Sequence, residues 1–195
     1  MNLDDYPDQD GKKVWLSQDE VDQLLDATDD AITDVAFRLA VRCGLRSEEV
    51  IGVAPNDVVD TDAGMMLRIW NGAKTGEYRE TPIPEALANT ITTIADVRDE
   101  SDDEPIVDVS KRTLRRRISA AAEQLEAETG DAGWQYVGMH DLRRTWATQL
   151  RSADVDAMVV LDWGGWNDLD TFLDHYRGTH TPEAQRRERG KVDWL

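Results

Sequence analysis

Six side chains suited to phosphoryl-transfer chemistry occur in order along the chain: Arg46, Lys74, His140, Arg143, Trp166 and Tyr176. Transfer of a phosphoryl group without a metal requires a nucleophile, fixed positive charge around the phosphate and a proton donor for the leaving oxygen. The set contains a group for each task. The chain has no Walker loop, paired-carboxylate metal site or zinc-type Cys/His spacing, so the sequence predicts neither a metal site nor a cofactor.

The first arginine of the set follows a helix and precedes another. Ser17 and Glu20 form a capping box that predicts a helix start. A second predicted helix spans residues 31 to 43 and stops at Gly44, and Ser47 is expected to cap the short segment EEVIGV. Arg46 therefore lies at a rigid junction from which a guanidinium can bind two phosphate oxygens.

A β-rich stretch follows, with three predicted strands in DVVD, GMMLRIW and YRETPIP. The pairs Asn71-Gly72 and Thr75-Gly76 mark tight turns, so Lys74 is expected at or beside a hairpin tip. The segment that begins at Pro84 returns to helix, and an acidic loop follows it.

Four further helices are predicted at 110–129, 140–152, 155–162 and 168–177. His140 and Arg143 are three residues apart in a first helical turn, so they share a face where free backbone N–H groups favour a phosphate. The expected fold class is α+β, a mostly helical domain with a small three-stranded antiparallel sheet.

Length and composition predict one soluble, intracellular domain, because 195 residues with 40% apolar content suffice for a single core. No run of about 18 apolar residues and no signal-like amino end occurs, so no membrane association is expected. Cys43 is the only cysteine and is interpreted as a packed thiol.

A net charge of −18 is unusual for a protein that binds nucleic acid, but the positively charged residues are clustered. The segment KRTLRRR interrupts the acidic chain and predicts a DNA-facing helix; a solvated face is the alternative. The segment HDLRRT adds Arg143 and Arg144 to the positively charged residues. The candidate DNA-binding residues are Lys111, Arg112, Arg115, Arg116 and Arg144.

The segments RCGLRSEEV, GAKTGEYRETPIP, MHDLRRTWATQL and DWGGWNDLDTFLDHYRG each resemble a landmark of the tyrosine recombinase (phage integrase) family. The resemblance spans residues 14 to 180. It implies the DNA breaking-rejoining fold, with residues 17–180 as catalytic domain, 1–16 as an N-terminal extension and 181–195 as a tail.

The resemblance also implies roles for the six residues. Arg46 and Arg143 would bind the scissile phosphate, His140 would assist proton transfer at the tyrosine hydroxyl and Lys74 would protonate the leaving 5′ oxygen. Trp166 would replace the family's second histidine; Trp163 competes for that position. Tyr176 would be the nucleophile, although it follows Trp166 by ten residues instead of about nine, and His175 occupies the usual slot.

The same resemblance implies a cytoplasmic enzyme whose partner is double-stranded DNA. Self-association into a tetrameric synapse would use the tail with Trp194 and Leu195. The family's amino-terminal DNA clamp would come from a separate protein or from a lost segment, or this chain would work alone. The acidic, lysine-poor surface resembles proteins of salt-accumulating archaea. Molar salt shortens the Debye length to about 3 Å and so erases most long-range repulsion from DNA.

Three alternatives remain open. The chain could be a decayed integrase-like DNA-binding regulator, a type IB topoisomerase-like enzyme that relaxes supercoils with the same nucleophile, or an acidic protein-interaction domain. The last explains the charge but not six ordered residues.

Overall fold

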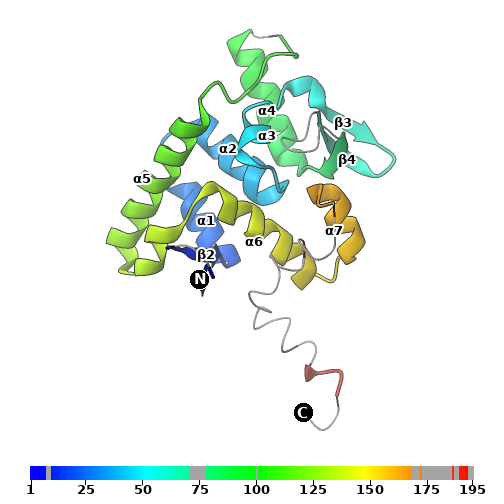
Figure 1. The fold of residues 1–195 in the computed structure, drawn as a ribbon. Helices are drawn as coiled ribbons and strands as arrows, with labels where there is room; N and C mark the ends of the chain where they lie inside the picture. The colour runs from blue at the N-terminus through cyan, green and yellow to red at the C-terminus, as the bar shows by residue number, and fades with distance from the viewer. Residues whose placement is uncertain are drawn as a thin grey trace.

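The computed structural model describes residues 1–7, 10–70, 78–99, 101–167, 172, 186 and 189–192, and Figure 1 shows the arrangement. The α-helices are α1 (Gln18–Asp26), α2 (Ala31–Arg42), α3 (Ser47–Val50), α4 (Glu85–Arg98), α5 (Lys111–Thr129), α6 (Met139–Ser152) and α7 (Ala157–Gly164). Strands β1 (Asn2–Asp5) and β2 (Lys12–Trp15) form one sheet, and β3 (Val58–Thr61), β4 (Gly64–Ile69) and β5 (Arg79–Pro82) form another. The expected fold class, mostly helical with a small three-stranded antiparallel sheet, is confirmed.

Local signals set most helix boundaries. The Ser17 hydroxyl accepts from the backbone N–H of Glu20, and the Glu20 carboxylate accepts from the Ser17 N–H, so the predicted capping box is present. α2 stops before Gly44, which has φ +69°; a Cβ there would lie 2.3 Å from Cε3 of Trp146. Both the backbone angle and the close indole therefore require glycine at this position.

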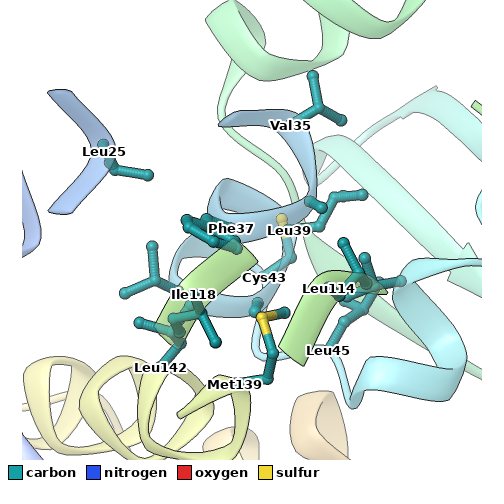
Figure 2. Close-up of a cluster of buried hydrophobic side chains, with 14 of the residues drawn as sticks. Leu25, Val35, Phe37, Leu39, Cys43, Leu45, Leu114, Ile118, Met139 and Leu142 are labelled. Carbon is teal, nitrogen blue, oxygen red and sulfur yellow. The ribbon is translucent and has the colours of Figure 1, made fainter. Parts of the chain in front are cut away.

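The core is built around α2, which packs against α1, α3, α4, α5 and α6. Figure 2 shows Phe37 and Leu39 of α2, Ile118 of α5 and Leu142 of α6 within one cluster of side chains, and all four are fully buried. Cys43 lies in the same cluster, and burial raises the pKa of its thiol. The predicted packed thiol is confirmed.

The three-stranded sheet is a meander in the order β3-β4-β5. Ile69 of β4 pairs with Arg79 of β5, so the two strands form a hairpin whose connection includes residues 71–77. The rings of Trp70 and Tyr78 lie 4.7 Å apart at the base of this connection, and the Trp70 indole N–H donates to Asp57 at 2.8 Å. Lys74 lies outside the described residues.

The first strands form a hairpin that the sequence did not predict. Asn2 pairs with Trp15, and the hairpin docks on α6 because Val14 N–H donates to Asp141 at 3.1 Å and Leu16 N–H donates to Thr145 at 3.0 Å. Burial raises the pKa of Asp141 despite the neighbouring Arg144.

Helices α4 to α7 match their predictions to within two residues at each end, and the helix predicted at 168–177 falls largely outside the described residues. The helix predicted over EEVIGV is shorter: α3 ends at Val50, and its N-cap is Arg46 where the sequence predicted Ser47. Two short 3-10 helices, Pro55–Asp57 and Ala132–Tyr136, were not predicted. Over the described part of the chain, none of the helices combines the length and apolarity needed to cross a bilayer.

Candidate functional site

The helix α6 presents the HDLRR motif through its first turns. Asp141 accepts from the backbone N–H of Gly138 and so satisfies the helix start. His140, the second residue of α6, is exposed, whereas Arg143 is only 2% exposed. The two predicted site residues therefore lie on the same helix at different depths, with the imidazole nearer to solvent.

Three arginines from three elements converge on the C-terminal end of α7. Arg79 Nε donates to the carbonyl of Trp163 at 2.9 Å, and Arg143 donates to that of Gly164 at 2.6 Å. Arg46 donates to the carbonyl of Gly165 at 3.0 Å. These three consecutive acceptors, called the 163–165 turn below, lie at a helix C-terminus, where unpaired carbonyls carry partial negative charge and favour cations.

Arg46 is held at the N-terminus of α3, as its position between two helices predicted. Its backbone N–H and its guanidinium donate to Glu49 at 2.7 and 2.9 Å. The side chain is 25% exposed and faces a cavity of about 350 Å³ that Trp166 and Tyr78 also line. A ligand in this cavity can therefore approach a guanidinium whose direction is already fixed.

Glu49 lies between two guanidiniums and is 2% exposed as a side chain. Arg79 donates to both carboxylate oxygens, at 2.8 and 2.9 Å, in the bidentate geometry that suits a guanidinium. Burial raises the pKa of Glu49, but the hydrogen bonds and charge of Arg79, together with those of Arg46, outweigh burial and lower it overall. Glu49 is therefore ionised at neutral pH.

Trp166 packs directly on Arg143. The guanidinium carbon of Arg143 lies 4.1 Å from the indole centroid, and Trp146 stacks on the same indole at 6.2 Å. Trp163 contributes its carbonyl to the 163–165 turn, while Trp166 supplies the ring that contacts the buried arginine. The contact with Arg143 is consistent with the choice of Trp166 over Trp163, which stays a prediction.

Gly164 allows that packing. A Cβ on Gly164 would lie 1.9 Å from Cζ3 of Trp166, and a Cβ on Gly165, which has φ +63°, would lie 2.8 Å from Cδ of Arg79. Neither site can hold a larger side chain unless the indole or Arg79 moves.

The structure thus brings Arg46, Arg143 and Trp166 together, with His140 one helical turn before Arg143. Lys74, His175 and Tyr176 lie outside the described residues, so their predicted roles stay predictions. Sequence reasoning missed Glu49 and Arg79. The strand alternation was a usable signal, because Arg79 shares a face with Thr81 and Ile83, which are both buried.

The predicted DNA-binding cations divide into two groups. Lys111, Arg112, Arg115 and Arg116 are exposed along the first two turns of α5, and Lys111 pairs with Glu48 at 2.6 Å. Arg144 differs from them, because it is 5% exposed and donates to Asp141 and to the hydroxyl of Tyr6. Its surroundings indicate that Arg144 fixes the N-terminal hairpin to α6 and does not face a solvent-side ligand.

Among the described residues, no cluster of three or more His, Cys, Asp or Glu side chains is arranged to hold a metal ion.

Comparison with known proteins places the chain in a family. The family model described as Phage integrase family matches residues 14–182, and the chain therefore belongs to the phage integrase family. It is 30% identical over 198 residues to tyrosine recombinase XerC of Chromobacterium violaceum, covering 94% of this chain and 62% of that protein. It is 27% identical to tyrosine recombinase XerA of Pyrococcus horikoshii, covering 91% of this chain and 61% of that protein. The chain thus spans about three fifths of these relatives.

Solved structures share the fold. The XerA recombinase crystal structure has a TM-score of 0.70 at 19% identity, covering 91% of this chain and 64% of that chain. The Tn1549 transposon integrase in complex with transposon right end DNA gives 0.69 at 14% identity, covering 96% and 68%. The catalytic domain of bacteriophage HP1 integrase gives 0.62 at 14% identity, covering 93% and 96%.

Proposed function

We propose that this chain is the catalytic domain of a site-specific recombinase that cleaves and rejoins double-stranded DNA through a 3′-phosphotyrosine intermediate. The observation that supports this most strongly is the convergence of Arg46, Arg143 and Trp166 on the 163–165 turn in a chain of the phage integrase family. Relatives named tyrosine recombinases and a similar integrase structure containing DNA favour the same reading.

In the proposed reaction, the Tyr176 hydroxyl oxygen attacks the scissile phosphorus and the bond from phosphorus to the 5′ oxygen breaks. His140 assists removal of the phenol proton, and Lys74 protonates the leaving 5′ oxygen. The products are a 3′-phosphotyrosine and a free 5′ hydroxyl. Attack by the 5′ hydroxyl of a partner strand reverses the step. The energy of the phosphodiester bond is kept in the phosphotyrosine, so the reaction requires neither ATP nor a metal.

Arg46 and Arg143 stabilise the charge that develops on the phosphate oxygens. Protein acceptors already orient both guanidiniums, so little reorganisation is needed when the charge forms. Removal of one such stabilising donor raises the barrier by about 3 to 4 kcal/mol. Trp166 supports Arg143 by its ring face and closes one side of the cavity that Arg46 faces.

The exposed cations of α5, Lys111, Arg112, Arg115 and Arg116, contact the DNA backbone in this proposal. The enzyme works in the cytoplasm at high salt as part of a tetrameric synapse, in which the tail with Trp194 and Leu195 docks on a neighbouring subunit. The acidic surface reflects a halophilic archaeal host.

The test is covalent trapping on nicked duplex DNA. Nicked duplexes with a randomised centre are incubated with the protein in molar salt, and DNA that stays attached after denaturation is recovered and sequenced. A nick near the scissile phosphate releases the short 5′-hydroxyl strand and prevents reversal. We expect an adduct with the wild-type protein and none with Tyr176→Phe.

The alternatives predict different results. Equal DNA binding by both proteins with no adduct from either supports the decayed regulator. Relaxation of supercoiled plasmid without strand exchange supports the topoisomerase-like enzyme, and absence of DNA binding supports the protein-interaction domain.

A further inference from the structure

Arg79 of β5 is nearly buried and uses its whole guanidinium in contacts with the site. Nη1 and Nη2 bind the two oxygens of Glu49, and Nε binds the carbonyl of Trp163. Each of its three side-chain nitrogens therefore has a protein acceptor, and the side chain is 9% exposed. A guanidinium provides this planar set of donors, whereas a lysine ammonium concentrates its donors at one point.

These contacts reach Arg46 through Glu49. The carboxylate that Arg79 binds also accepts from the Arg46 backbone N–H and guanidinium, and Arg46 completes its contacts on Gly165. Without Arg79, a carboxylate that is 2% exposed would have Arg46 as its remaining cationic partner. A buried carboxylate that loses one of its two cationic partners draws the remaining guanidinium toward itself or recruits water.

Arg79 is also the first residue of β5, shortly after the segment that contains Lys74. Its partner in the sheet is Ile69, the last residue of β4. One side chain thus connects the base of this hairpin with α3 through Glu49 and with the C-terminus of α7 through Trp163.

We propose that Arg79 is a positioning residue, which holds Arg46, the 163–165 turn and the base of the Lys74 hairpin in one fixed arrangement without contacting the DNA. The proposal rests on the proposed function for its effect on cleavage, and on the contacts above for its effect on geometry. Removal of Arg79 lowers the cleavage rate and leaves DNA affinity nearly unchanged. A displacement of about 1 Å at a reacting group can reduce a rate about 100-fold.

The first test compares Arg79→Ala with Arg68→Ala, using the nicked duplex recovered by trapping. Arg68 is a matched control because it is an arginine of the same sheet, on β4, and pairs with Glu80 at 3.7 Å. The hydrogen bonds to the 163–165 turn come from Arg46, Arg79 and Arg143. We expect single-turnover adduct formation to fall about 100-fold in Arg79→Ala, with DNA dissociation constants within about threefold of wild type and no such loss in Arg68→Ala.

Chemical rescue distinguishes positioning from general destabilisation. Arg79 lines the cavity that Arg46 also faces, so a small cation can enter the space left by Arg79→Ala. Millimolar guanidinium should bind Glu49 and restore the rate at least tenfold, whereas equal methylammonium should not. A rate within threefold of wild type, a loss confined to DNA affinity, or a folded variant that guanidinium does not rescue would overturn the proposal.

A second measurement works without DNA and so separates this proposal from the proposed function. With 5-fluorotryptophan incorporated, Trp166 is assigned by Trp166→Phe, and its 19F resonance should shift in Arg79→Lys and Arg79→Ala but not in Arg68→Ala. Guanidinium should return the Arg79→Ala resonance toward its wild-type position. An unchanged Trp166 resonance refutes the positioning role. Failure of the wild-type protein to form an adduct refutes the recombinase function and leaves the 19F result to decide the role of Arg79.

Discussion

The guanidinium of Arg143 lies 4.1 Å from the centre of the Trp166 indole and donates to the carbonyl of Gly164, two residues before that tryptophan. Phe172 meets the same indole edge-on at 5.1 Å. The arginine is therefore oriented by an aromatic face and by the backbone that leads to it. Cation–π contacts of desolvated arginines contribute about 2 kcal/mol, so the pairing has both a stability and a geometric effect.

Trp166→Ala should lower the free energy of unfolding by about 3 to 5 kcal/mol, because it leaves a large cavity and removes the ring beneath Arg143. Trp166→Phe keeps a smaller aromatic face and should cost less. Urea unfolding measures both. Trp70→Ala is the control, since Trp70 is 59% exposed and its removal should cost about 1 kcal/mol through the Asp57 hydrogen bond. Equal losses of stability for Trp166→Ala and Trp70→Ala would contradict this account.

Gly164→Ala should lower stability by about 1 to 3 kcal/mol, because the added methyl overlaps the Trp166 ring and forces it to move. Gly52→Ala is the matched control, since its nearest neighbour to a Cβ is a backbone oxygen at 3.6 Å. Thermal unfolding of the two variants gives the comparison. A Gly164→Ala protein as stable as the control would mean that the indole packs differently.

Glu49→Gln should cost about 3 to 5 kcal/mol at neutral pH, because it leaves two guanidiniums on a neutral partner. The folded pKa of Glu49 is lowered, so its contribution is present above the ordinary glutamate value of about 4.3 and is lost as pH falls through the folded pKa. The stability difference between wild type and Glu49→Gln should therefore shrink on acidification.

Among the described residues, Arg46 and Arg79 form ion pairs with Glu49, and Glu48, Asp57 and Arg68 line a small adjoining cavity of about 90 Å³ with it. Glu48→Gln is the control, because Glu48 is half exposed and its pair with Lys111 should contribute at most about 1 kcal/mol. A Glu49→Gln protein with the same pH profile of stability as wild type would show that the ionised Glu49 carboxylate does not stabilise the fold.

The sequence was sufficient for elements that local signals determine. Ser17 with Glu20 starts α1, Gly44 ends the turn after α2, and the periodicities of α5 and α6 are correct. Family resemblance, and not spacing alone, singled out Arg46, Arg143 and Trp166 among many arginines and tryptophans. Glu49 and Arg79 were missed because their pairing joins residues 30 apart, and no local pattern specifies that β5 lies against α3.

Arg144 shows that a local charge pattern alone does not distinguish a buried arginine from an exposed one. Charge clustering groups it with the α5 cations, yet Asp141 lies three residues before it on the same helix and binds it in a buried position. The sequence of the β1–β2 hairpin indicates an acidic N-terminal extension instead of two strands. Its exposed Asp4 and Asp5, which pair with half-buried Lys13 and Lys12, resemble a solvated segment.

Asp141→Ala should release that hairpin from α6. The change removes the acceptor for the N–H groups of Val14 and Gly138 and leaves Arg144 buried without its carboxylate, which should cost about 3 to 5 kcal/mol. Hydrogen exchange should accelerate most at residues 12–16. Asp141→Asn retains one acceptor oxygen and should show a smaller effect. Unchanged exchange at Val14 in Asp141→Ala would contradict the docking role.

The exposed cations of α5 should determine how strongly the affinity for duplex DNA depends on salt. Combined substitution of Arg112, Arg115 and Arg116 by Gln should reduce the slope of log affinity for duplex DNA against log salt by about 0.9 for each phosphate that is no longer neutralised. Fluorescence anisotropy over a salt series measures this slope. Arg38→Gln is the control, because Arg38 pairs with Asp34 within α2. An unchanged slope in the triple variant would place the DNA on another face.

The 163–165 turn has one acceptor for each of three arginines, so its length is fixed by stoichiometry. Adding or deleting a residue within it would shift every guanidinium to the neighbouring oxygen and rotate the indole that follows. A change in chain length downstream of Trp166 leaves these three pairings in register. The interval of ten residues from Trp166 to Tyr176 begins after this turn, so its length does not alter which carbonyl each arginine binds.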